Sequence, residues 1–450
     1  MLLRDDTIVA VATPPGHGGV GVVRVSGPAS FRIASLLTGR TTAWRPRHVT
    51  RARVAADGIV ADALVTVFAS PSSYTGEDVV EIAAHGNPLL LAAIVARAVD
   101  CGARPAQPGE FTLRAFVRGK LDLVQAEAVR DLVEAVSPAQ VRNAARQVEG
   151  ILSARIGAIA TELRRLETLL EASVDFPDEG YRFVDGPAVA SAIAAVRQDM
   201  TSLLGDEAAA AGLRDGVQVV ITGAPNVGKS SLFNALLGSD RSIVTPTPGT
   251  TRDLVSERLV LGGALVRLVD SAGVRTTTDA IELEGVRRAS AAAAAADLVV
   301  FVLDQSVAPT AEVRAHLAGL DGRVLVVANK CDLPPALDAG DVGRPVLRVS
   351  ATAGEGLAVL AQAIGELLRG VGSASDAAIV ANPRQRAALA ASLGFIEHAC
   401  SEFARVGPTL PEEFVLQDLR GALDALDDVV GRRSREEILG EIFQTFCIGK

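Results

Sequence analysis

The first part of the chain alternates short apolar runs with turn-rich loops, a pattern typical of a sheet crossed by few helices. Strands are predicted where β-branched and apolar residues cluster, at residues 7–12, 21–26, 63–68 and 78–82. The loop 13–19 has strong turn chemistry, with two prolines and three glycines. An apolar helix is predicted over residues 89–100. We therefore expect residues 1–117 to form an N-terminal α+β domain.

From residue 118 the apolar positions recur at helical spacing. Long helical stretches are predicted over residues 121–136, 141–173 and 186–211, and again near the C-terminus over residues 382–403, 416–430 and 434–446. The C-terminal helices follow a linker at residues 370–375 and are too few to form a core of their own. We therefore expect residues 118–212 plus 376–450 to form one discontinuous, all-α helical bundle.

Between the two helical parts, short strands alternate with helices, which predicts a doubly wound α/β sheet. Buried strands are predicted at residues 217–221, 265–269, 298–303, 324–328 and 346–349. We expect residues 213–375 to form this domain, inserted into the bundle. Such insertions are tolerated because the two ends of a domain often lie close together.

Composition limits the class of protein. A chain of 450 residues exceeds one ordinary core, so two to four domains are expected. No apolar run is long enough to span a bilayer, and the N-terminal residues do not form a signal peptide. Four scattered cysteines without a Cys-x-x-Cys pair argue against a disulfide framework or zinc site and indicate the cytoplasm. The net charge of −9 implies that any RNA is held by a local patch or a second protein.

The segment Gly223-Ala224-Pro225-Asn226-Val227-Gly228-Lys229-Ser230 matches the Gly-x-x-x-x-Gly-Lys-Ser phosphate-binding loop. It lies between a predicted strand and a predicted helix, which is the context that this loop requires. Gly223 and Gly228 permit a tight turn whose N–H groups point at negative oxygens. Lys229 can then reach the β- and γ-phosphates, and the Ser230 hydroxyl can bind Mg²⁺.

Three further motifs follow predicted strands and indicate GTP. Asn329-Lys330-Cys331-Asp332 presents a carboxylate that accepts from N1–H and N2–H₂ of guanine, and adenine lacks that pair of donors. Asp270 is placed to hold Mg²⁺ through water, and Thr251 is the candidate second hydroxyl ligand. The predicted GTP-binding residues are Asn226, Val227, Gly228, Lys229, Ser230, Ser231, Thr245, Pro246, Thr247, Pro248, Gly249, Thr250, Thr251, Asp270, Ser271, Ala272, Gly273, Asn329, Lys330, Asp332, Ser350, Ala351 and Thr352.

These motifs occur with a distinctive pair of ends. Thr-Pro-Pro-Gly-x-Gly-Gly-Val-Gly begins at Thr13, Ser73-Tyr74-Thr75-Gly76-Glu77-Asp78 follows, and the chain finishes in Cys447-Ile448-Gly449-Lys450. The whole set resembles the MnmE (TrmE) family of tRNA-modification GTPases. The GTPase motifs alone fit several relatives, and the two ends make the match specific. The resemblance implies a folate-binding N-terminal domain, a helical domain and an inserted Ras-like GTPase domain.

The resemblance also implies how GTP is hydrolysed. Val274 stands where Ras-type enzymes place a water-orienting glutamine, so catalysis needs another source. In the family K⁺ takes the place of an arginine finger. The matching K⁺ ligands are Asn226, Thr245, Thr247 and Thr250. Glu282 matches the residue that positions the attacking water and joins Lys229 among the predicted catalytic residues; without the resemblance, a solvated helix-face carboxylate is the favoured explanation.

The switch segment departs from the usual family pattern at two positions. Pro246 and Pro248 follow Thr245 and Thr247, and a residue before proline is biased to extended backbone. Both carbonyls stay available, but we expect a stiffer loop.

In the family the N-terminal domain binds 5-formyl-tetrahydrofolate, or a related folate, at a dimer interface. The matching positions are Arg24, Glu81, Lys120 and Lys450. Basic residues suit the folate carboxylates, and a carboxylate suits the N–H edge of the pterin. Taken alone, Arg24 and Glu81 are better explained by a solvated sheet face. Cys447 is a predicted catalytic residue, with a small buried residue as the alternative.

The resemblance finally implies partners. We expect a homodimer that works with the flavoprotein MnmG, as a heterotetramer or larger assembly, to add an aminomethyl or carboxymethylaminomethyl group to C5 of wobble uridine U34. The partner then makes most of the tRNA contact. The alternative is a regulatory GTPase switch in ribosome assembly. Against it, no Gly-x-x-Gly RNA clamp or basic tail follows residue 372.

Overall fold

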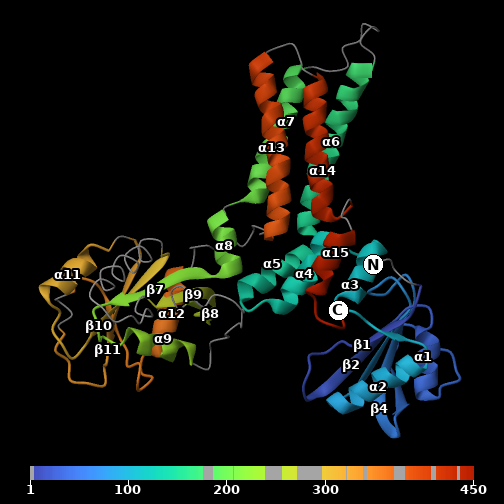
Figure 1. The fold of residues 1–450 in the computed structure, drawn as a ribbon, viewed down its shortest axis with the longest axis horizontal. Coiled ribbons are helices and arrows are strands. Elements are labelled where there is room, and N and C mark those ends of the chain that lie inside the picture. The colour runs from blue at the N-terminus through green and yellow to red at the C-terminus, as the bar shows by residue number, and fades with distance from the viewer. Residues whose placement is uncertain are drawn as a thin grey trace. The chain divides into compact units, whose positions relative to one another are not determined.

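The computed structural model divides into two compact units (Figure 1). Unit 1 comprises Met1–Val133, Ala145–Met200 and Pro383–Lys450, and unit 2 comprises Glu134–Ala144 and Thr201–Asn382. The structure describes residues 5–175, 186–205, 207–238, 256–270, 296–320, 322–337, 342–368, 381–406, 412–432 and 436–450.

The N-terminal part of unit 1 is a six-stranded sheet in the order β3-β4-β5-β2-β1-β6. Its strands are β1 Ile8–Val11, β2 Gly18–Ser26, β3 Thr50–Ala56, β4 Ile59–Phe68, β5 Val79–Gly86 and β6 Arg104–Pro105. Only the β1–β6 pair is parallel. The strand β3 was absent from the sequence prediction, because its alternating arginines give a weak apolar signal.

Helices pack against both faces of this sheet. The helices α1 Ser30–Thr38 and α2 Pro88–Asp100 share a buried core with one face, which includes Val23, Ile33 and Ile94. On the other face, α3 Glu110–Val117 buries Phe111 against Ile8 and Ala10. The resulting α+β fold matches the prediction and leaves the β2–β5 pair beside α3.

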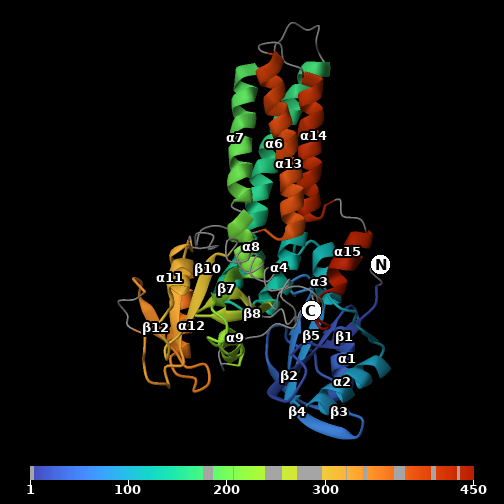
Figure 2. The ribbon, with the colours of Figure 1, turned by 60° about the vertical axis from the view of Figure 1, so that its left-hand side comes forward.

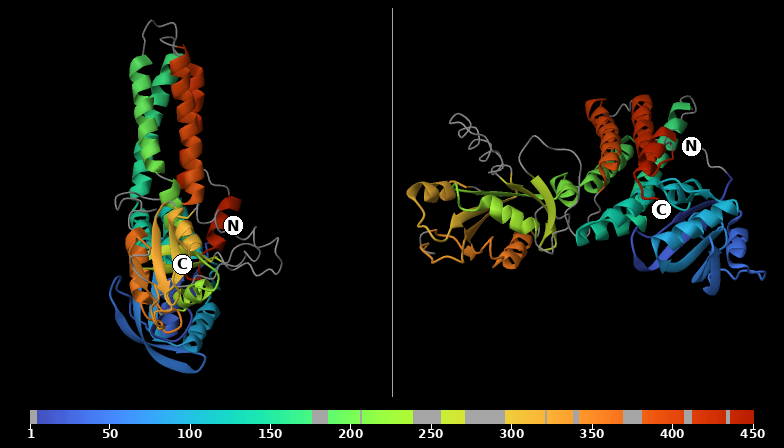
Figure 3. Two further views of the ribbon diagram at one scale, coloured as in Figure 1. Left: turned by 90° about the vertical axis from the view of Figure 1, so that its left-hand side faces the viewer. Right: turned by 60° about the horizontal axis from the view of Figure 1, so that its bottom comes forward.

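The remainder of unit 1 is helical. Its elements are α6 Ile151–Asp175, α13 Pro383–Val406, α14 Glu412–Val430, α15 Glu436–Gln444 and all but the last residue of α4 Leu123–Glu134. The helices α5 Pro138–Val148 and α7 Gly186–Leu204 each cross the division between the units. Long segments far apart in sequence lie side by side, with α6 and α7 next to α13 and α14 (Figures 2 and 3). Helices from both sides of unit 2 in the sequence therefore form one bundle.

Two predicted helical stretches are interrupted. The stretch 141–173 is wrong as a continuous helix, because the chain breaks between α5 and α6 at Gly150, whose φ is +83°. The stretch 186–211 is also wrong as one helix, because α7 ends at Leu204 and Gly205 has φ +57° before α8 Glu207–Asp215. In both cases a glycine adopts the left-handed conformation that ends a helix.

Unit 2 contains a second six-stranded sheet in the order β12-β11-β10-β7-β9-β8. Its strands are β7 Val217–Gly223, β8 Ser256–Leu261, β9 Ala264–Asp270, β10 Leu298–Asp304, β11 Val324–Asn329 and β12 Val346–Arg348. All neighbours are parallel except β8 and β9. The strand order reverses at β7, the topological switch point where open α/β sheets bind ligands.

Helices cover both faces of this sheet as well. The helices α9 Lys229–Leu237 and α12 Leu357–Leu368 share a core with one face, and α11 Ala311–Ala318 packs through Leu317 on the other. The predicted doubly wound α/β fold is therefore present. Parallel strands end at one edge, and this edge carries Gly223, Asp270, Asp304 and Asn329.

Candidate functional site

The phosphate-binding loop joins β7 to α9 at the carboxyl edge of the sheet. Gly228 precedes α9 with φ +94°, and a Cβ atom there would collide with the side-chain nitrogen of Asn329. Gly223 has φ +145° and packs against the carbonyl of Val302 in β10. Both glycines are thus required by backbone angle and by close approach. They leave the first N–H groups of α9 facing the loop, as an anion site requires.

Lys229 lies folded over this loop. Its Nζ donates to the carbonyl oxygens of Gly223, at 3.0 Å, and Ala224, at 2.8 Å. Burial lowers the pKa of Lys229, and the nearby carboxylate of Asp270 opposes that shift. A phosphate that enters the loop would offer the ammonium stronger, charged acceptors than these carbonyls.

The two groups expected near Mg²⁺ are in contact. The Ser230 hydroxyl donates to Oδ2 of Asp270 at 2.8 Å, and Asp270 is 3% exposed at the end of β9. A hydroxyl and a carboxylate beside a phosphate loop are the oxygen donors that Mg²⁺ selects, with water and substrate oxygens in the other positions. The donor set therefore fits Mg²⁺.

The base-recognition segment is tied to the phosphate loop. Asn329, at the end of β11, donates from Nδ2 to the carbonyl of Val227 at 2.9 Å, and its Oδ1 accepts from the N–H of Ala351 at 3.1 Å. Asn329 is 2% exposed, so these bonds satisfy a buried amide. Asp332 is exposed beside them, where a guanine edge can reach it. The Asn329 side chain thus joins the base-recognition segment to the phosphate loop and to the turn that contains Ala351.

A short turn completes this side of the site. Ser350 is buried, its Oγ accepts from the N–H of Ala353 at 3.0 Å, and it lies 3.3 Å from the hydroxyl of Thr352. The turn orients the backbone that includes the Ala351 N–H.

Lys330 has a partner that the sequence analysis did not assign. Its Nζ donates to the carbonyl of Asn226 at 3.1 Å and to Oδ2 of Asp304 at 2.5 Å. In the sequence Asp304 only closes an apolar run. Its role could have been inferred from its position at the carboxyl end of β10, because the neighbouring strand β11 carries the guanine-recognition motif.

Several predicted residues lie outside the described residues. They are Thr245, Pro246, Thr247, Pro248, Gly249, Thr250, Thr251, Ser271, Ala272, Gly273 and Glu282. Of the predicted K⁺ ligands, the described part of the chain includes only Asn226, which has φ +63°.

A second cluster of predicted residues lies in unit 1. Arg24 on β2 and Glu81 on β5 are directly opposite each other, and Nε of Arg24 donates to Oε1 of Glu81 at 3.0 Å. The guanidinium carbon also lies 5.5 Å from the ring centre of Tyr74 and 5.7 Å from that of Phe111. Aromatic rings at this distance attract a cation and exclude water from one side of it. The sequence analysis gave neither ring a role.

The C-terminal residues approach this pair. The Arg24 side chain donates to the carbonyl of Gly449 at 3.2 Å. Gly449 has φ +97°, and a Cβ atom there would collide with the carbonyl of Val11. Burial lowers the pKa of Lys450, with a further lowering by the positive charge of Arg24 and an opposing effect of Cys447. The C-terminal Lys450 therefore lies near Arg24, and its backbone N–H donates to the carbonyl of Cys447 at 3.4 Å.

Lys120 makes a different contact. Its Nζ donates to the carbonyl of Pro71 at 3.2 Å, and its side chain lies against Gly76. It therefore contacts the segment that carries Tyr74.

A buried ionic cluster supports the same segment. Arg114 of α3 is fully buried, and it pairs with Glu77 at 3.2 Å, Asp6 at 2.5 Å and Glu110 at 3.0 Å. Glu77 also accepts from the Ser26 hydroxyl at 2.7 Å. Burial alone would lower the pKa of Arg114, but these carboxylates outweigh it and raise the pKa. The cluster holds the segment around Tyr74 against β2 and α3.

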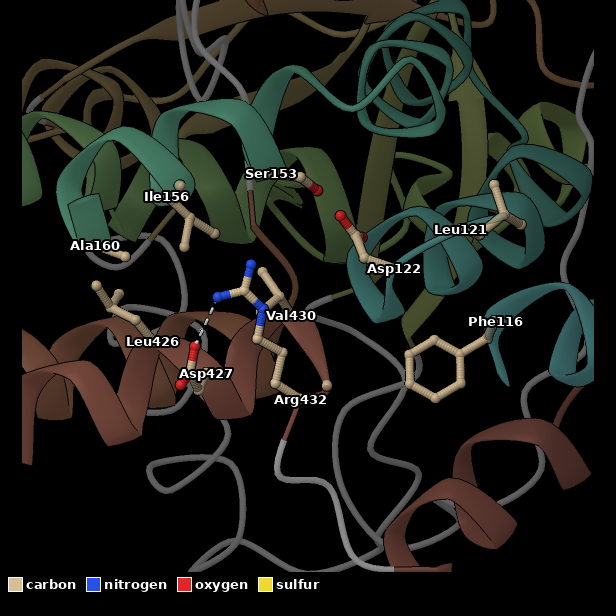
Figure 4. Close-up of a pocket in the computed structure, with 12 residues that line it drawn as sticks. Phe116, Leu121, Asp122, Ser153, Ile156, Ala160, Leu426, Asp427, Val430 and Arg432 are labelled. Atoms are coloured by element: carbon tan, nitrogen blue, oxygen red, sulfur yellow. Dashed lines mark hydrogen bonds and ion pairs between the residues drawn. The ribbon is translucent and has the colours of Figure 1, made fainter. Parts of the chain in front are cut away.

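A separate cavity of about 330 Å³ lies among α6, the end of α14 and the turn before α4 (Figure 4). Asp427 pairs there with Arg432 at 3.3 Å and with Arg164 at 3.1 Å. The Ser153 hydroxyl is buried without a hydrogen-bond partner among the described residues. None of the four predicted folate residues lines this cavity.

Comparison with known proteins gives the family. Residues 7–120 match the model described as GTP-binding protein TrmE N-terminus, and residues 123–447 match that of the MnmE helical domain. The tRNA modification GTPase MnmE of Koribacter versatilis is 41% identical over 454 residues, which cover 99% of both chains. The chain belongs to the MnmE family of tRNA modification GTPases.

The predicted resemblance to MnmE is thus confirmed. The MnmE proteins of Stutzerimonas stutzeri and Pseudomonas fluorescens are 39% and 38% identical, with all of both chains covered. Among solved structures, Era of Aquifex aeolicus bound to GDP and AlF₄⁻ is 25% identical over 40% of this chain and 66% of that chain, with a TM-score of 0.27, too low for a structural inference. Membership in the MnmE family makes this chain a GTPase that acts in tRNA modification.

Within the described residues, no helix combines the length and the apolar character that a membrane span requires.

Proposed function

We propose that the chain uses Mg²⁺-dependent, K⁺-stimulated GTP hydrolysis to support modification of wobble uridine. Together with the flavoprotein MnmG it adds an aminomethyl or carboxymethylaminomethyl group to C5 of U34 in certain tRNAs. One observation distinguishes this proposal from a GTPase without a second substrate site. The Arg24–Glu81 pair is contacted by the carbonyl of Gly449 near the C-terminus and lies beside the rings of Tyr74 and Phe111. A regulatory GTPase switch in ribosome assembly, the alternative function, does not require such a site.

In the nucleotide site each side chain has a separate task. The N–H groups of the phosphate loop and Lys229 bind the phosphates, and Ser230 with Thr251 ligates Mg²⁺, supported by Asp270 through water. Asp332 and the Ala351 N–H bind guanine. Asn226, Thr245, Thr247 and Thr250 hold K⁺, which stabilises charge that develops on the leaving oxygen. Glu282 orients the attacking water.

In the second site the residues fit a folate. Arg24 and Lys450 offer positive charge to carboxylates, Glu81 can accept from the N–H edge of a pterin, and the rings of Tyr74 and Phe111 border the pair. Lys120 lies against the adjoining segment. The bound 5-formyl-tetrahydrofolate, or a related folate, supplies the one-carbon unit. We propose that Cys447 acts at this site.

The assembly follows from the same proposal. We propose three domains: residues 1–117, residues 118–212 plus 376–450, and residues 213–375. A homodimer would cover the exposed apolar residues Ile59, Val60 and Leu64 on β4, and MnmG would carry most of the tRNA contact. Because its substrate is tRNA, we place the protein in the cytoplasm.

An omission series tests the proposal in solution. The purified chain is mixed with a flavoprotein of the MnmG class and a reductant for its flavin, unmodified tRNA, GTP, the folate, glycine or ammonium as the amine donor, and KCl, and U34 is analysed by mass spectrometry. We expect product only in the complete mixture, with loss on omission of the folate or of GTP and a strong decrease when NaCl replaces KCl. Product formed at the full rate without folate, or without this chain, would contradict the proposal.

A further inference from the structure

The end of β10 presents a charged group to the guanine-recognition motif. Asp304 pairs in register with Asn329, and the backbone pairing continues one step further because Gln305 N–H donates to the carbonyl of Asn329 at 2.9 Å. This register places the Asp304 carboxylate beside Lys330. The adjacency is therefore built into the sheet.

The Asp304 carboxylate is held on both oxygens. Its Oδ1 accepts from the N–H of Ser306 at 2.9 Å and from the Ser306 hydroxyl at 2.6 Å. Its Oδ2 accepts from Nζ of Lys330 at 2.5 Å, and the Asp304 side chain is only 16% exposed. A carboxylate with three short hydrogen bonds has one orientation, so it can fix a cation rather than merely attract one.

Lys330 needs such support. Its φ is +64°, which is a strained angle for a residue with a side chain, and its side chain has four rotatable bonds. The ammonium nevertheless bridges Asp304 and the carbonyl of Asn226, whose φ is +63°. Lys330 thereby crosses from the base-recognition motif to the phosphate loop.

We propose that Asp304 is a positioning residue for guanine-nucleotide binding, which acts through Lys330 to hold the base-recognition motif and the phosphate loop in one arrangement. Asp304 touches neither the base nor the phosphates. Its loss therefore weakens nucleotide affinity and leaves the hydrolytic step unchanged once GTP is bound. This inference rests on the proposed guanine-nucleotide site.

The test measures affinity and turnover separately in the full-length chain. Binding of a fluorescent mant-GDP is measured by titration and stopped flow, and kcat and KM for GTP are measured in KCl. The variants are Asp304→Ala, Asp304→Asn, Lys330→Ala and the double variant. The matched control is Asp297→Asn, because Asp297 precedes the opposite end of β10 and accepts from the N–H of Gln218 at 2.8 Å.

We expect Asp304→Ala to raise the mant-GDP Kd roughly tenfold or more, since a hydrogen bond to a charged group is lost. KM for GTP rises in parallel, while kcat and the Asp297→Asn control stay within about twofold of wild type. Asp304→Asn keeps the volume and can still bond to Ser306, so it should give an intermediate loss and serves if the alanine variant does not fold. Because Asp304 acts through Lys330, adding Asp304→Ala to Lys330→Ala should give less than about a twofold further loss.

Three results would overturn the inference. They are a wild-type Kd in Asp304→Ala, a fall in kcat with KM unchanged, and additive losses in the double variant, which would show that Asp304 does not act through Lys330. If the wild-type chain itself fails to bind guanine nucleotide, the proposed function fails as well. If wild type binds tightly and Asp304→Ala binds equally well, the inference about Asp304 is refuted and the proposed function still stands.

Discussion

The buried pair between α4 and α13 gives the sharpest stability prediction. Arg384, in the first turn of α13, donates to both carboxylate oxygens of Glu127 at 2.7 and 2.8 Å, across 257 residues of sequence. It also donates to the backbone carbonyls of Asp428 and Val429, both at 3.0 Å. Gln385 adds a bond of 2.7 Å to Glu127, whose side chain is 4% exposed. One arginine therefore joins three helices.

Replacing Arg384 with alanine leaves the Glu127 carboxylate buried with one remaining donor. Removing one partner of a buried ion pair costs about 3–5 kcal/mol. We expect the lower end, about 3 kcal/mol, because Arg384 is 27% exposed and Gln385 still donates. For a unit of this size that loss corresponds to a fall of roughly 6–12 °C in the melting temperature.

The assay is differential scanning calorimetry of the full chain, following the transition that Arg384→Ala shifts. Arg405→Ala is the control on the same helix. The Arg405 side chain is 69% exposed and, among the described residues, pairs with Glu402 three positions earlier, so its loss should leave the melting temperature almost unchanged. Replacing both partners, Arg384→Met with Glu127→Leu, should recover most of the loss. The reasoning is refuted if Arg384→Ala and Arg405→Ala melt together, or if the double replacement is as unstable as Arg384→Ala.

Three further predictions follow from single contacts. Gly228→Ala should abolish mant-GDP binding, because a Cβ there collides with Asn329 at a φ of +94°; wild-type fluorescence titration would contradict this. Gly449→Ala should displace the C-terminal residues, because a Cβ atom there collides with the carbonyl of Val11 at a φ of +97°. Folate affinity measured by calorimetry should fall at least tenfold, while GTP hydrolysis without folate stays unchanged. An unaltered folate affinity would argue against the site. The Asp418 carboxylate, 2.7 Å away, raises the pKa of His398. The stabilisation from this pair is therefore fully present just below the ordinary histidine pKa and is lost as the pH rises through the raised pKa. NMR titration should show a lower His398 pKa in Asp418→Asn, and an unchanged pKa would contradict this assignment.

Local sequence signals predicted the elements that carry the nucleotide site. The apolar run of β7, the glycines of the phosphate loop and the strand before Asn329 all depend on residues close together in the chain, so pattern and spacing sufficed. The interrupted helices show the limit of that signal. The amphipathic pattern continues across Gly150 and Gly205, so it gives no sign that a helix ends at either residue. Their positive φ angles, which the structure shows, mark the ends.

Contacts between distant segments were not predictable in this way. The contact between Asp304 and Lys330 depends on the register of β10 and β11, which the sequence does not specify. The pairing of Glu127 with Arg384 depends in the same way on the packing of α13 against α4. The rings of Tyr74 and Phe111 come from two segments far apart in the sequence that both approach Arg24, a relationship that periodicity does not encode. Apolar pattern identifies which side of an element is buried, whereas polar partners depend on the tertiary arrangement.

The most direct test of the account is made in cells that lack the gene. Bulk tRNA is digested to nucleosides, and wobble-uridine modifications are quantified by mass spectrometry after complementation with wild type, Lys229→Ala, Cys447→Ser or Glu81→Gln. We predict that the modified uridine disappears on deletion and returns only with wild type, because the nucleotide and folate sites serve one reaction. An unchanged uridine profile in the deletion strain, without a second gene copy, would contradict the account.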